Sequence, residues 1–143
     1  MNDVGNAINL LNGAQNSSGK NVVLNSNFSV WQRGTSGTAN SFSAGAGYNA
    51  DRWQNYSNAN AITVSRQATG DTTNLPFIQY CARVQRNSGQ TSTNAVTMGQ
   101  SIETVNSVNY AGKPITFTFY ARAGANFSAA SNALTATLYS GTG

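Results

Sequence analysis

The feature that most constrains the fold of this chain is a period-two alternation of apolar and polar residues. The clearest example is the segment 115–122, where Ile115, Phe117 and Phe119 alternate with threonine and tyrosine. Because successive side chains of a β-strand point to opposite faces, this pattern predicts a strand with one buried face. Weaker runs of the same kind predict strands within 62–65, 78–84, 96–102 and 134–138, and 22–31 is a candidate first strand.

Turn-forming residues separate these runs. They occur at Gly45-Ala46-Gly47, Gly70-Asp71, Asn87-Ser88-Gly89, Gly112-Lys113-Pro114 and Gly124-Ala125-Asn126. Several short strands with polar turns and no extended helical pattern predict an all-β protein, and we expect a jelly-roll β-sandwich. The 143 residues are enough for one such domain, which we assign to 21–143.

The first twenty residues follow a different pattern. Val4, Ile8 and Leu11 are spaced so that they would form one apolar stripe on a short helix. A helix of nine or ten residues is marginal in isolation, so this stripe needs a surface to pack against. We therefore interpret 1–20 as a helical or extended segment, followed by a linker, that docks on another protein or mediates oligomerisation.

Composition excludes several classes of function. Only 8% of the residues are charged. Eight Lys and Arg against four Asp and Glu residues give a net charge of +4, and the basic residues are scattered singly. Nucleic-acid-binding proteins usually cluster basic residues on one face, so we expect no nucleic-acid partner. The chain has no His and one Cys, Cys81, which leaves no zinc ligand set, no Ser-His-Asp triad and no internal disulfide. We expect neither a metal nor another cofactor.

Membrane and secretion signals are also missing from the sequence. No apolar run is long enough to span a bilayer, and no apolar segment follows a basic start as in a signal peptide. We expect synthesis in a cytoplasm and no membrane insertion. The abundant Asn, Ser and Thr side chains would suit a surface that contacts sugars, because amides and hydroxyls match hydroxyl partners.

Two neighbouring segments concentrate the large and charged side chains of the chain. The first is 25–35, Asn-Ser-Asn-Phe-Ser-Val-Trp-Gln-Arg-Gly-Thr, and the second is 48–53, Tyr-Asn-Ala-Asp-Arg-Trp. Together they contain both tryptophans, Trp31 and Trp53. This pair resembles the opening of a β-sandwich module of bacteriophage tail-fibre and related virion proteins. That module begins with Asn-x-x-Phe-x-x-Trp-Gln-Arg-Gly and continues with Ala-Asp-Arg-Trp.

Two later segments are similar to the same module in the same order. Gln100-Ser101-Ile102-Glu103 resembles a Gln-x-Ile-Glu strand, and 112–123 resembles a strand that carbohydrate-binding jelly rolls with a galactose-binding-like fold also contain. Modules of this kind have further strands after the position of Leu138 and Tyr139, so either the natural chain continues beyond Gly143, which we favour, or neighbouring subunits complete the sheets.

The motif residues have structural and functional interpretations. Trp31 and Trp53 are large enough to anchor a core, although a sugar-stacking platform is the alternative. For Asp51 we expect hydrogen bonds from Arg33 or Arg52 and from backbone N–H groups, which would pin the first two strands together; a binding cluster is the alternative.

Candidates for a glycan site come from the tyrosines, which offer an apolar face and a hydroxyl. Among Tyr56, Tyr80, Tyr110, Tyr120 and Tyr139 we select Tyr56 and Tyr120. Asp51 and Glu103 are the one conceivable acid pair for glycoside cleavage, which needs two carboxyl groups on either side of one bond. With four acidic residues in the chain, we expect no enzymatic activity.

The resemblance implies a component of a phage tail or head fibre that attaches the virion to a host surface glycan. Such fibres are usually homotrimers, and the segment bearing Val4, Ile8 and Leu11 would dock on other virion proteins or on its trimer mates. The expected location is the surface of the phage particle. Two alternatives remain: a structural decoration protein of the capsid or tail, and a carbohydrate-binding module of a longer depolymerase.

Overall fold

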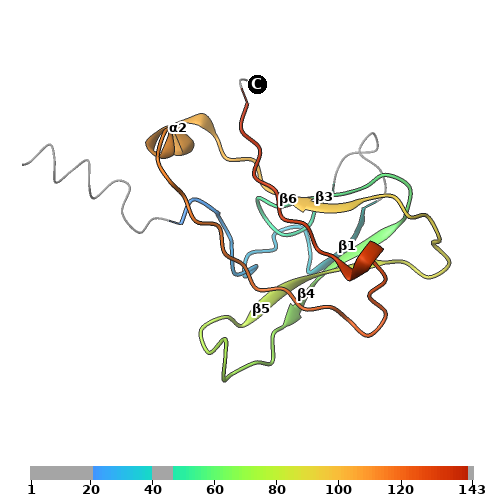
Figure 1. Cartoon of the computed structure of the whole chain (residues 1–143). Helices are drawn as coiled ribbons and strands as arrows, with labels where there is room; N and C mark the ends of the chain where they lie inside the picture. Colours follow the sequence, from blue (N-terminus) through green and yellow to red (C-terminus); the bar gives the residue numbers. More distant parts are fainter. Residues whose placement is uncertain (1–20, 40–46, 142–143) are drawn as a thin grey trace, which may run out of the picture. The chain divides into compact units, whose positions relative to one another are not determined.

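Two three-stranded antiparallel sheets form the body of the protein in a computed structural model, which describes residues 21–39 and 47–141 (Figure 1). The first sheet has the order β1-β4-β5 and the second the order β2-β3-β6. The strands are β1 (Ser36–Ala39), β2 (Gly47–Tyr48), β3 (Gln54–Ser57), β4 (Ile62–Ala68), β5 (Tyr80–Arg86) and β6 (Val96–Gly99). The prediction of an all-β protein is confirmed at this level. The docking segment with Val4, Ile8 and Leu11 lies outside the described residues.

Helical structure in the described residues is short. It consists of α2 (Thr104–Ser107) and two 3₁₀ turns, η2 (Val108–Tyr110) and η3 (Ala130–Asn132). The chain divides into two compact units, one ending at Gly112 and the other beginning at Lys113. Both sheets belong to the first, N-terminal unit.

The core of the N-terminal unit lies on one face of β4. Ile62 and Val64 are completely buried there, and Ala50, completely buried, and Trp31, almost so, belong to the same cluster. Phe28, Trp53 and Ala82 pack against this cluster while remaining partly exposed. β1 lies next to β4 and also contacts β2 and β3, so the two sheets approach each other at β1.

The register of β4 and β5 confirms the alternation predicted for these strands. Val64 is opposite Val84, and Ala68 is opposite Tyr80, so the apolar residues of β5 share a face with the buried residues of β4. Arg83 lies on the other face, opposite Ser65. β6 covers the start of the run predicted at 96–102 and ends at Gly99.

The predicted first strand at 22–31 is wrong, because this segment folds into turns. Asn25 and Phe28 both have positive φ values, 49° and 53°, which interrupt an extended chain. The Phe28 N–H donates to the Asn25 carbonyl at 3.1 Å and closes a tight turn. Tertiary hydrogen bonds of this segment therefore outweigh the local preference of its apolar residues.

The strands predicted at 115–122 and 134–138 are also absent from the described residues of the C-terminal unit. Alternation indicates which face a strand would bury, but a strand exists only through hydrogen bonds to a neighbour. Lys113–Gly141 contains no paired segment, and Phe117 and Phe119 are 54% and 51% exposed, their rings 5.6 Å apart. The apolar side chains of this unit remain largely open to solvent.

Strand β3 was missed by the sequence analysis because its buried positions are polar. Asn55 and Ser57 are completely buried, whereas Gln54 and Tyr56 are partly exposed. The Asn55 amide donates to the Gly47 carbonyl at 3.1 Å and thereby adds a side-chain bond to the β2–β3 pairing. A strand that buries amide and hydroxyl groups has no apolar alternation to reveal it.

Candidate functional site

A pocket with a volume of about 340 Å³ opens on the N-terminal unit. Three segments that are separate in the sequence contribute its lining, namely the two tryptophan-bearing segments and the segment before α2. The lining residues are Arg33, Tyr48, Asp51, Arg52, Ser101 and Glu103. The volume lies near the lower end of the range of small-molecule sites, which is roughly 300–1,000 Å³.

Asn25 holds the two tryptophan-bearing segments together. Its Nδ2 donates to the carbonyls of Val30, at 2.9 Å, and Asp51, at 3.0 Å, while its Oδ1 accepts from the Val30 N–H at 3.0 Å. Its backbone carbonyl accepts from Trp53 Nε1 at 3.1 Å. With φ at 49°, Asn25 occupies the left-handed region, which asparagine tolerates better than most residues. This explains physically why an asparagine begins the motif.

The two indoles belong to or pack against the core and do not line the pocket. Trp31 is 8% exposed, belongs to the core, and donates from Nε1 to the Phe28 carbonyl at 2.6 Å. Trp53 packs against the Phe28 ring with a centroid separation of 5.1 Å and an interplanar angle of 40°. Both indoles thus make contacts typical of core anchors, and the stacking platform considered as the alternative is not formed in this pocket.

Asp51 links the two segments through the backbone. Its Oδ2 accepts from the Gln32 N–H at 2.8 Å, and its own N–H donates to the Val30 carbonyl at 3.1 Å. The expected hydrogen bond to Asp51 from Arg33 or Arg52 is not formed in the described part of the chain, so this prediction is wrong. Arg52 instead forms an ion pair with Glu103, and the Arg33 guanidinium lies over the Tyr48 ring, 5.7 Å from its centroid.

The Arg52–Glu103 pair joins residues 51 positions apart. Sequence spacing places Arg52 next to Asp51, but consecutive side chains leave the backbone in different directions, and Arg52 has a φ of 73°. Glu103 becomes available because β6 pairs with β3 and brings the following segment to the pocket. Only the tertiary structure makes Glu103 the nearer carboxylate.

Glu103 is held in its ionised form. The hydrogen bond from Arg52 lowers the pKa of its carboxyl below the ordinary value of 4.5, and bonds from the Glu103 backbone and the Asn106 amide act in the same direction. A general acid for glycoside cleavage needs a raised pKa, so that it carries a proton near neutral pH. Asp51 and Glu103 do line one pocket, but this electrostatic environment does not suit Glu103 to proton donation.

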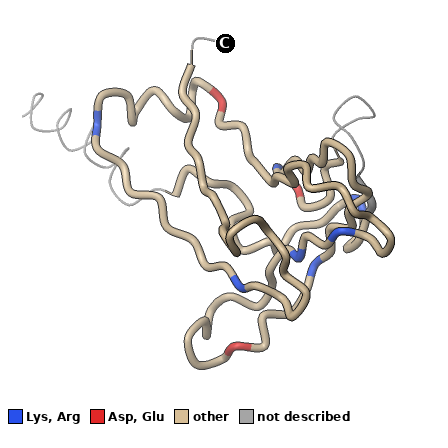
Figure 2. Tube along the Cα trace, turned by 45° about the vertical axis from the view of Figure 1, so that its right-hand side comes forward, with Lys and Arg blue, Asp and Glu red and all other residues tan. Residues whose placement is uncertain are grey.

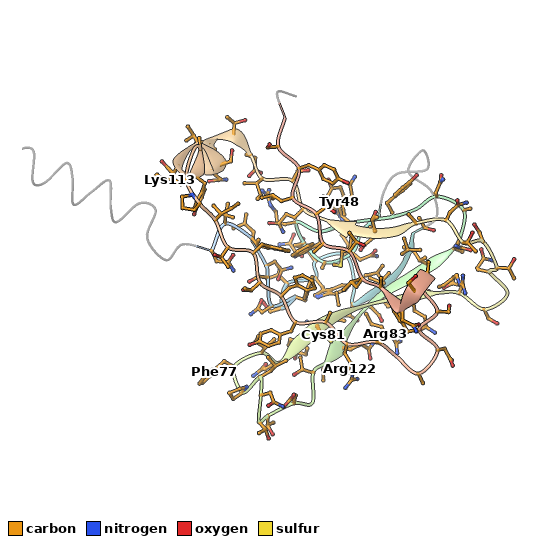
Figure 3. The ribbon with its side chains drawn as sticks, in the orientation of Figure 1. Tyr48, Phe77, Cys81, Arg83, Lys113 and Arg122 are labelled. Atoms are coloured by element: carbon orange, nitrogen blue, oxygen red, sulfur yellow. The ribbon has the colours of Figure 1, made fainter. Side chains whose placement is uncertain are left out.

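The tyrosines selected from the sequence do not line the pocket. Tyr56 is partly buried on β3 and its hydroxyl lies 3.2 Å from Asn58 Oδ1, while Tyr120 is 77% exposed in the C-terminal unit. Tyr48 is the aromatic residue of the pocket, and it lies on β2 beside β3 (Figure 3). Its place in the second motif, next to Asp51 and Arg52, was the signal that could have identified it.

Two kinds of feature, a metal-ligand cluster and a membrane-spanning helix, are absent from the described residues. No group of three or more His, Cys, Asp and Glu residues in the described parts of the chain could hold a metal ion. Figure 2 shows the acidic positions, in red, at separate points of the described trace rather than in one cluster. No helix among the described residues is both long and apolar enough to cross a membrane.

The chain was also compared with known proteins. None of the protein-family models, curated proteins or solved structures in these comparisons matches it. The pocket and the sequence motifs that line it are therefore the basis for assigning a function.

Proposed function

We propose that this protein is a non-catalytic component of a bacteriophage fibre, on the tail or the head, that attaches the virion to a glycan of the host surface. The observation that carries the proposal is the pocket lined by the segments that resemble the phage module. Tyr48 offers an apolar ring, while Ser101 and Asp51 offer hydroxyl and carboxylate groups. Sugar rings require this combination of an apolar surface and hydrogen-bonding groups.

The finer architecture that we propose is a jelly-roll β-sandwich. Two antiparallel sheets that approach each other at β1 are consistent with a sandwich. The alternating segment 115–122 is unpaired in the structure, and the jelly roll that we propose would require it to pair as an edge strand. Hydrogen exchange of the whole chain tests this proposal. Slow exchange at every second amide of 115–122 is the expected result for an edge strand, and uniformly fast exchange would contradict it.

Attachment through such a site would depend on several copies. A single open pocket that binds one sugar unit is expected to be weak, with a dissociation constant on the order of millimolar. A homotrimer on the particle surface would present three pockets, and simultaneous contacts raise the apparent affinity by roughly 10² to 10⁴ when their geometry allows it. The protein would be made in the host cytoplasm and incorporated into the virion there.

A glycan array with the oligomeric full chain tests this function. We expect binding to a subset of bacterial surface polysaccharides, with loss of the signal on dilution to monomer and in Tyr48→Ala. Tyr120→Ala is the matched control, because it removes an exposed tyrosine outside the pocket. If the oligomer binds no saccharide, or if Tyr48→Ala binds as the wild type does, the proposed function is wrong.

The second candidate function is a structural one, in which the protein decorates a capsid or tail and binds no sugar. The exposed apolar side chains of the C-terminal unit favour it, because large exposed apolar surfaces often mark protein interfaces. The docking segment 1–20, with Val4, Ile8 and Leu11, would attach the domain to the particle. Deleting 1–20 should abolish incorporation into particles while leaving the sheets folded by circular dichroism. Normal incorporation of the truncated protein would refute docking through this segment.

A further inference from the structure

The charges of the pocket are balanced, and this bears on which ligands it can accept. Arg33 and Arg52 are opposed by Asp51 and Glu103, so the lining has no formal net charge if both carboxyl groups are ionised. Arg52 and Glu103 neutralise each other's charge as an ion pair. The charged groups of the lining without an ionic partner are therefore one guanidinium, from Arg33, and one carboxylate, from Asp51.

The remaining hydrogen-bonding capacity suits hydroxyl groups. Asp51 uses Oδ2 to accept from the Gln32 N–H, and Oδ1 has no partner among the described residues, so it can accept from a ligand. Arg33 can only donate, and the Ser101 hydroxyl can do both. A hydroxyl group donates and accepts at once, so adjacent hydroxyls of a sugar can use Arg33 and Asp51 together. A carboxylate ligand could use Arg33 but would be repelled by Asp51, while the charges of Glu103 and Arg52 largely cancel each other.

Two groups of the pocket, Asp51 and Arg33, already have partners before a ligand arrives. Asp51 is held by three hydrogen bonds to the other tryptophan-bearing segment, and the Arg33 guanidinium lies over the Tyr48 ring. Tyr48 remains 44% exposed, so part of its surface can contact an apolar face of a ligand. Because these groups lose little freedom on binding, they can select between ligands of similar shape.

We infer that this pocket binds an uncharged pyranose sugar with adjacent free hydroxyl groups and discriminates against sugars that carry a carboxylate. The inference rests on the proposed glycan-binding function and adds the chemical class of the ligand. Asp51 is the residue that sets the preference, because it both accepts from hydroxyl groups and repels anions. Tyr48 contributes affinity for either class through apolar contact.

Saturation-transfer NMR titrations of the full chain test the inference. The uncharged probes are the methyl glycosides of glucose, galactose, mannose and N-acetylglucosamine, and the anionic probe is methyl glucuronide. We expect at least one uncharged probe to bind about tenfold more tightly than methyl glucuronide. Tyr48→Ala should weaken that binding by about tenfold or more, whereas Phe77→Ala should not change it. Phe77 is 93% exposed in the loop between β4 and β5 and lies away from Tyr48 in Figure 3.

Asp51→Asn provides the sharper test, since the amide oxygen can still accept from the Gln32 N–H and should preserve the fold. This variant should bind methyl glucuronide several-fold more tightly than the wild type does, and the uncharged probe more weakly. A preference of the wild-type protein for methyl glucuronide would overturn the inference but leave glycan binding standing, and so would an unchanged preference in Asp51→Asn. Absence of binding to every probe and to the glycan array would overturn both.

Discussion

Replacing Asn25 with alanine should destabilise the protein more than any other single change in the motif segments outside the core. The substitution removes three side-chain hydrogen bonds, which join the Val30 backbone and the Asp51 carbonyl. Each contributes roughly 1 kcal/mol net, and placing alanine in the left-handed region at φ 49° costs about 1 kcal/mol more. Because Asn25 is partly exposed, water recovers some of the loss. We therefore expect the free energy of unfolding to fall by about 2–4 kcal/mol.

Urea denaturation followed by tryptophan fluorescence measures this change, since Trp53 donates to the Asn25 carbonyl and should report on the same region. Asn27→Ala is the matched control in the same turn. Asn27 is exposed and its Oδ1 accepts from Ser29 alone, so we expect a loss of about 1 kcal/mol or less. Asn25→Gly should be less damaging than Asn25→Ala, because glycine adopts a positive φ without strain.

The reasoning would be refuted by equal losses in Asn25→Ala and Asn27→Ala. In that case the bonds from Asn25 would not hold the two tryptophan-bearing segments together in solution. A greater loss in Asn25→Gly than in Asn25→Ala would contradict the assignment of backbone strain at this position.

Two further predictions concern the core and the pocket. Ile62→Ala should lower the free energy of unfolding by about 2–5 kcal/mol, because the side chain is completely buried, whereas Ile115→Ala, at a position 53% exposed, should cost clearly less in the same urea assay. Equal costs would contradict the burial of Ile62. For Glu103, whose folded pKa is below 4.5, the contribution to stability is present above pH 4.5 and is lost as the pH falls through the folded pKa. Glu103→Gln should therefore be less stable than the wild type at pH 7, and the difference should shrink as the pH is lowered below 4.5; a difference independent of pH would refute the role of its ion pair.

Local sequence patterns were sufficient for the strands that bury apolar side chains. Ile62 and Val64 alternate with polar residues, and Tyr80, Ala82 and Val84 do the same on the neighbouring strand, as their observed register requires. Alternation predicts such strands because it is a property of consecutive residues, and the hydrophobic effect acts on it wherever one face of a sheet is covered.

Patterns that depend on distant partners were beyond the reach of the sequence. The segment 22–31 looked extended, but the bonds of Asn25 to residues on another segment turn it back on itself. The segment 115–122 has the alternation of a strand, yet no paired neighbour occurs in its unit among the described residues. In both cases the structure depends on which backbone groups meet in space.

The sequence by itself determined that the protein is built mainly of β-strands, and it identified the two tryptophan-bearing segments as candidates for its core and its site. The tertiary structure alone decided that Tyr48, rather than Tyr56 or Tyr120, lines the pocket, and that Arg52 pairs with Glu103. The physical reason is that the alternation of buried and exposed side chains is a property of consecutive residues, whereas ion pairs and pockets form between segments that are distant in the sequence. Their partners become neighbours only after β3 has paired with β6.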